Sequence, residues 1–137
     1  MNMKDILKLW EPVKGLQNVM DVEAIHDDYE GFRILLRGED PPLRMLRVRF
    51  AAPISYRNTE ESFCSLDVSQ PANHDVLGKV FYIVENSSYV DYFNEMTQGL
   101  FAHWELKHYM VYGHSNCIDV ISAIPPIVEW LDKLDEE

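Results

Sequence analysis

Apolar and polar residues alternate most regularly in the second half of Leu43–Ala51, where apolar side chains alternate with arginines. This period of two predicts a strand with one face in a core and one basic face. Val19–His26 and Phe32–Arg37 are apolar-rich runs separated by Asp27–Gly31, which predicts a β-hairpin with a five-residue loop. The apolar run within Val76–Glu85 predicts a further, buried strand.

Helical spacing occurs near both ends of the chain and once in between. Apolar residues around Met3–Leu9 and after Pro125 recur every three or four positions, as on one face of a helix. Ser88–Gly99 begins with a serine that has an acidic residue three positions later and ends in glycine, which predicts a capped helix. Trp104–Tyr112 and Cys117–Ala123 are expected to be neighbouring antiparallel strands. We therefore predict an α+β fold: an antiparallel β-sheet meander with helices packed on one face, including N- and C-terminal helices.

The chain has 137 residues, 47% of them hydrophobic and 26% charged, which is typical of one globular domain over residues 1–137. Its formal net charge of -11 argues against nucleic acid or an anionic membrane as the main partner, because both need a basic surface. No apolar run is long enough for a membrane-spanning helix, and the first residues do not form a secretory signal. Cys64 and Cys117 are too few for a disulfide framework, so we expect free thiols in a cytoplasmic protein, a monomer or homodimer.

All six arginines lie between Arg33 and Arg57. Only Glu39 and Asp40 oppose them within residues 32–57, so six positive and two negative charges give this segment a local charge of +4. We interpret five of them as the solvated face of a hairpin, salt-bridged to nearby acids: Arg33, Arg37, Arg44, Arg47 and Arg49. A groove for phosphate or RNA is the alternative, but it lacks the interleaved aromatic side chains that single-strand binders use.

No phosphate loop, serine-hydrolase elbow, zinc-protease helix or paired-cysteine motif occurs in the sequence. His103, His108, His114 and Cys117 do lie within 15 residues of one another. On one strand, however, His103 and His108 would point to opposite faces, because their positions differ by an odd number. We therefore expect no metal and no cofactor, and whether His108, His114 and Cys117 converge in space stays open.

His108 is expected to be buried and hydrogen-bonded, because it shares a strand face with apolar neighbours. Cys64, His108 and Asp119 also supply the residue types of a thiol nucleophile with a base and an orienting acid. The apolar surroundings of Cys64 disfavour a reactive thiolate, so no catalytic residue is assigned. A small enzyme with a site around His108 and Asp119 is one alternative to a binding protein. An oligomeric adaptor that pairs through an exposed strand edge is the other.

Five short segments in the second half of the chain carry a resemblance to a known class of proteins. They are Val84–Ser87, Tyr92–Phe93, Leu106–Tyr109, Ile118–Ser122 and Pro125–Val128. Over about 80 residues the chain resembles the immunity proteins that bacteria encode beside polymorphic toxins of the contact-dependent inhibition and Rhs types. The resemblance implies a non-catalytic binding protein that neutralises one cognate protein toxin.

An acidic protein of this class suits a basic toxin such as a nuclease, because opposite charges speed association and fix specificity. Two acidic surfaces are the expected contacts: the tip of the first hairpin, where a tyrosine can fill a pocket, and the outward side of the Ser88–Gly99 helix. The residues assigned to partner binding are Asp27, Asp28, Tyr29, Glu30, Asp91, Glu95 and Glu105.

Overall fold

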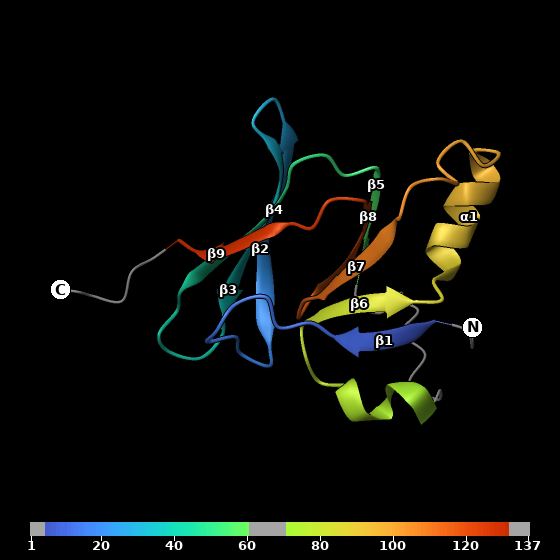
Figure 1. Cartoon of the computed structure of the whole chain (residues 1–137). Coiled ribbons are helices and arrows are strands. Elements are labelled where there is room, and N and C mark those ends of the chain that lie inside the picture. The colour runs from blue at the N-terminus through green and yellow to red at the C-terminus, as the bar shows by residue number, and fades with distance from the viewer. Residues whose placement is uncertain (1–4, 61–70, 132–137) are drawn as a thin grey trace.

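Two antiparallel β-sheets lie face to face in the computed structural model of the chain, which describes residues 5–60 and 71–131 (Figure 1). Sheet A has the strand order β1-β6-β7-β8-β5, and sheet B has the order β2-β3-β4-β9. Sheet A consists of β1 (Ile6–Leu9), β5 (Ser55–Glu60), β6 (Phe81–Glu85), β7 (Lys107–Tyr112) and β8 (Asn116–Ser122). Sheet B consists of β2 (Met20–Asp28), β3 (Gly31–Gly38), β4 (Met45–Phe50) and β9 (Ile127–Trp130). The helices of the described residues are α1 (Ser88–Met96) and the 3₁₀ helix η2 (Pro71–Val76).

The space between the sheets is filled by apolar side chains that alternate along the strands. β3 and β4 pair with Ile34 opposite Val48, and each strand turns every second residue inward. Phe50 of sheet B meets Tyr109 of sheet A, with ring centroids 5.5 Å apart. The buried residues of this core are Met20, Phe32, Ile34, Leu36, Leu46, Val48, Phe50, Val80, Phe81, Tyr109, Val111, Ile118 and Val120.

The other face of sheet A is covered by α1 and η2 (Figure 1). Tyr89 and Phe93 of α1 pack with Ile121 of β8, and Val76 of η2 packs in a cluster with Tyr82 of β6. The central strands β7 and β8 are therefore buried on both faces, so polar residues on them need partners inside the protein. None of the helices in the described part of the chain is long and apolar enough to cross a membrane.

The described chain is mostly β, so the predicted α+β fold with helices at both ends is wrong. The segment predicted as an N-terminal helix contains strand β1, which pairs with β6 and places Leu7 opposite Val84. Leu7 is buried while Lys8 is exposed. Over so few residues the helical and strand periods fit the same apolar positions, and the hydrogen bonds offered by β6 decide between them.

The predicted C-terminal helix is also wrong where the structure describes it, because this segment forms strand β9 along β4. Val128 lies opposite Val48 and packs against the core between the sheets. The indole Nε1 of Trp130 donates a hydrogen bond to the carbonyl oxygen of Lys14, 2.8 Å away. The two prolines that suggested a first helical turn suit the approach to an edge strand equally well. The remainder of that predicted helix, residues 132–137, lies outside the described residues.

The first hairpin and the capped helix are confirmed, with local changes. β2 and β3 are joined by only Tyr29 and Glu30, a tighter turn than the predicted five-residue loop. Helix α1 is capped by Ser87 rather than Ser88, because the Oγ of Ser87 accepts a hydrogen bond from the backbone N–H of Val90 at 3.1 Å.

Phe50→Ala should lower the free energy of unfolding by about 3–5 kcal/mol, because it removes a fully buried ring from between the sheets. Leu43→Ala is the control, since Leu43 is 53% exposed. That control should change the stability by less than about 0.5 kcal/mol. Urea unfolding followed by tryptophan fluorescence measures both variants, and equal losses would contradict this placement of the core.

Candidate functional site

A chain of hydrogen bonds runs across sheet A beneath the start of α1. His108 Nε2 lies 2.6 Å from Asp119 Oδ1, and His108 Nδ1 lies 2.8 Å from the Oγ of Ser87. The other carboxylate oxygen of Asp119 accepts a hydrogen bond from Arg57 Nε at 3.0 Å. The side chains of His108 and Asp119 are only 1% and 4% exposed, so water cannot replace a lost partner. We call these four residues the buried polar chain, whose outer end, Arg57, is 45% exposed.

Three strands and the cap of α1 supply the buried polar chain. In the register of sheet A, Asp119 on β8 lies opposite Met110 on β7 and opposite Arg57 on β5. His108 is two positions from Met110, hence on the same face and diagonal to Asp119. Because Ser87 is the N-cap of α1, its contact with His108 fixes the place on the sheet where the helix begins.

Charge and burial oppose each other at Asp119. Burial alone would raise the pKa of its carboxyl, because a charged carboxylate loses its water. The hydrogen bond from His108, together with the charges of His108 and Arg57, outweighs burial and holds this pKa below its usual value. The Arg57 guanidinium also stacks over the ring of Tyr89, 4.2 Å from the ring centroid. The Tyr89 hydroxyl shares a hydrogen bond of 2.7 Å with Ser55 of β5, which ties the helix to the edge of sheet A.

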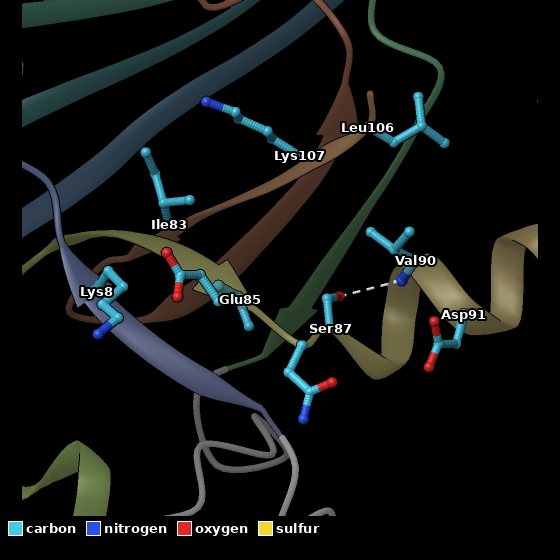
Figure 2. A pocket seen from close by; sticks show the side chains of 10 residues that line it. Lys8, Ile83, Glu85, Ser87, Val90, Asp91, Leu106 and Lys107 are labelled. Atoms are coloured by element: carbon cyan, nitrogen blue, oxygen red, sulfur yellow. Dashed lines mark hydrogen bonds between the residues drawn. The ribbon is translucent and has the colours of Figure 1, made fainter. Parts of the chain in front are cut away.

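A cavity of about 420 Å³ opens beside Ser87, among β1, β6, the start of β7 and the first turn of α1 (Figure 2). In Figure 2 the hydroxyl of Ser87 is directed toward the backbone nitrogen of Val90. The charged side chains of Lys8, Glu85 and Lys107 lie around this cavity. A small polar molecule could therefore come near Ser87, which makes catalysis the first chemistry to consider.

Ser87, His108 and Asp119 have the residue types of an acyl-transfer triad. In such a site the histidine hands a proton to the leaving group, so the nitrogen beside the serine must also face the substrate. His108 is buried, so its ring cannot face a substrate. The Ser87 hydroxyl oxygen already accepts a hydrogen bond from the backbone N–H of Val90. The arrangement favours fixing α1 to sheet A over catalysis. Cys64, part of the thiol hypothesis, lies outside the described residues.

The tip of the first hairpin carries one of the two predicted contact clusters. Tyr29 is 96% exposed there. Its acidic neighbours have partners: Arg33 forms ion pairs with Asp28 at 2.8 Å and with Glu30 at 4.0 Å. Asp27 accepts a hydrogen bond from a tyrosine hydroxyl of β5 at 3.0 Å. The predicted cluster is present, but an arginine neutralises part of its charge.

The outward side of α1 and the turns after it carry the other predicted acids, and all three are exposed. The sequence prediction of this surface missed the apolar residues between them. Tyr92, Met96, Leu100 and Trp104 are 59%, 57%, 73% and 53% exposed. Their spacing of four positions was visible in the sequence, but a buried helical stripe has the same spacing. We call the following residues the α1 face: Asp91, Tyr92, Glu95, Met96, Leu100, Trp104 and Glu105.

The histidines and the cysteine that cluster in the sequence do not converge. His103 and His114 are exposed, whereas His108 and Cys117 are buried. The Nδ1 of His114 instead lies 2.5 Å from the Oε2 of Glu39. Among the described residues, the group of three potential metal ligands that come together includes neither His108 nor Cys117.

No protein-family model, curated protein or solved structure matches this chain. A function therefore has to be inferred from the geometry of the buried polar chain and of the surfaces around it.

His108→Ala should lower the free energy of unfolding by about 1–3 kcal/mol, because it leaves two buried partners unsatisfied and opens a cavity. His103→Ala removes an exposed imidazole and should have an effect below about 0.5 kcal/mol. Chemical denaturation measures both. If His108→Ala unfolded like the parent, the supporting role of the buried polar chain would be refuted.

Asp119 should also make the stability depend on pH in the acid range. Its pKa in the folded protein lies below its usual value of 3.8, so its contribution is fully present above that pH. The contribution is lost as the pH falls further, through the folded pKa. Thermal unfolding between pH 2 and pH 5 should therefore show a steeper loss of stability on acidification for the parent than for Asp119→Asn. Parallel pH profiles would contradict the argument.

Proposed function

We propose that this protein is an immunity-type binding protein that neutralises a cognate protein toxin by one-to-one contact, with the α1 face at the centre of that contact. The observation that carries the proposal is the row of four large, exposed apolar side chains on and after α1. The class of partner is proposed from the resemblance noted above. The α1 face is the surface where we propose that this partner binds.

Large apolar side chains on a surface suit protein recognition. Single exposed apolar residues are common, but four on one helix and the turns that follow it, with acidic residues next to them in the sequence, are typical of a contact surface. Aromatic residues and methionine are enriched at protein interfaces, and tyrosine and tryptophan dominate their energetic centres. Tyr92 and Trp104 are the candidates for that centre, and each is more than half exposed.

The charge of the α1 face indicates a basic partner. Asp91, Glu95 and Glu105 are exposed beside the apolar residues, and the last turn of α1 contains no basic residue. The whole chain carries a formal charge of -11. A basic protein, such as a toxin that holds nucleic acid, would be attracted over a distance and would find opposite charges at the rim of the contact.

The first hairpin lies on the other side of edge strand β5 from the α1 face, because consecutive strand residues point to opposite faces. Two consecutive residues of β5 connect the clusters: Ser55 hydrogen-bonds to Tyr89 of α1, and the Tyr56 hydroxyl donates to Asp27 of the hairpin. Figure 1 shows the hairpin tip and the turns after α1 at the same, upper end of the molecule. Tyr29 is therefore a second candidate contact, separated from the α1 face by the edge of sheet A.

The test uses the C-terminal domain of a large gene adjacent to this one, which the proposal requires to encode the toxin. Tyr92→Ala should weaken binding at least about tenfold, because it removes a central aromatic contact. Glu95→Lys should lower the association rate and its dependence on salt. Surface plasmon resonance at two salt concentrations measures both effects, and co-expression with the toxin measures protection of the host cell.

Matched controls separate the α1 face from general changes to the surface. Leu43→Ala and Glu11→Lys alter an exposed leucine and an exposed acid elsewhere, and both should bind like the parent. Normal binding by Tyr92→Ala with weakened binding by Tyr29→Ala would move the centre to the hairpin and refute the α1 face. Failure of the parent to bind or protect against that toxin would refute the immunity function.

A further inference from the structure

We propose that Asp21, Glu39 and His114 form a binding site for a zinc-type divalent cation at the junction of the two sheets. One possible ligand atom from each of these residues lies within 4.8 Å of the other two. The site is separate from the α1 face, so the inference stands or falls independently of the proposed function.

The three ligands come from distant parts of the chain. Asp21 is in β2, Glu39 follows β3, and His114 lies in the turn between β7 and β8. Two of these strands belong to sheet B and two to sheet A. A cation held by all three residues would therefore link the sheets directly. We expected no metal because of the spacing of histidines on one strand. That argument could not include Asp21 or Glu39, which lie far from His114 in the sequence.

Hydrogen bonds to the backbone hold the three ligands in place. The N–H of His114 donates to the carbonyl oxygen of Met20, the residue before Asp21, at 2.8 Å. Next to Glu39, the amide side chain of Gln17 makes two hydrogen bonds to the backbone of Asp40, at 2.7 and 3.0 Å. Two of the ligands thus sit beside fixed backbone, and the third is in a paired strand.

The donor atoms suit a borderline cation. One imidazole and two carboxylates are ligands that zinc accepts at about 2.0–2.2 Å, with a fourth position left for water. Tetrahedral ligands at that distance lie about 3.3 Å from one another. His114 Nδ1 and Glu39 Oε2 are 2.5 Å apart, so they need to separate by less than about 1 Å to admit the ion. The cation would take the place of the proton that now joins them.

Charge balance also favours a cation. Asp21 and Glu39 bring two carboxylates close together, which is unfavourable without positive charge between them. The nearest arginine in the pairing register, Arg37 opposite Asp21, forms an ion pair with Glu23 at 3.1 Å. His114 pairs with Glu39 of these two carboxylates. A divalent ion between the carboxylates would balance the charge of both.

The experiment uses the untagged full chain, stripped of metal with a chelator and titrated with zinc chloride. Isothermal titration calorimetry should show one zinc per chain. The unfolding temperature should rise by at least about 4 °C when the free zinc concentration is a hundred times the dissociation constant. Asp21→Asn, Glu39→Gln and His114→Ala should each weaken zinc binding at least about tenfold, because each removes one of three ligands.

The controls remove the same groups outside the site. Asp40→Asn removes one carboxylate from the same loop, and both hydrogen bonds between Asp40 and Gln17 use the backbone of Asp40. His103→Ala removes one exposed imidazole. Both should bind zinc like the parent and show the same rise in unfolding temperature. The proposal is overturned if the parent binds no zinc, or if the control variants lose as much affinity as the three site variants.

Discussion

The hydrogen bond between His108 and Asp119 is the constraint on which the position of α1 depends. Both residues lie on strands covered on both faces, so each polar atom must find its partner inside the protein. Asp119 is satisfied by His108 and Arg57 together. The remaining nitrogen of His108 is satisfied by Ser87, the residue that caps α1. The needs of two buried polar residues therefore decide where the helix starts on the sheet.

A fixed start determines which side of α1 faces the solvent. Tyr89 and Phe93 turn inward against Ile121, and the α1 face turns outward. Arg57, stacked on Tyr89 while bonded to Asp119, holds the same turn from the side of β5. A surface ordered before binding loses less conformational entropy than one that must order during binding. In this way a buried network can raise the affinity for a partner that it does not touch.

Sequence pattern predicts the parts of this fold whose signal is long or unambiguous. β4 and the first hairpin follow from alternation, and the burial of His108 follows from its apolar neighbours. The terminal strands are four residues each, too short to separate a period of two from one of 3.6. Sequence analysis grouped His108 with Asp119 by residue type, but it missed Ser87, which lies 21 residues from His108 and meets it only through the folding of sheet A. The contacts of Glu39 with His114, 75 residues apart, were hidden for the same reason.

The arginine-rich segment shows why net charge is the better guide to the partner than local charge. Ion pairs join Arg33 to Asp28, Arg37 to Glu23, Arg47 to Glu129 and Arg57 to Asp119. Three of the five arginines expected on the hairpin face, Arg33, Arg37 and Arg47, therefore pair with acids. A nucleic-acid phosphate would have to displace those carboxylates before it could form an ion pair with these arginines. The exposed acids of the α1 face lie next to exposed apolar side chains. Electrostatic attraction by the acids and burial of the apolar side chains would therefore favour binding of the same partner. A basic protein surface with an apolar centre meets both conditions at once.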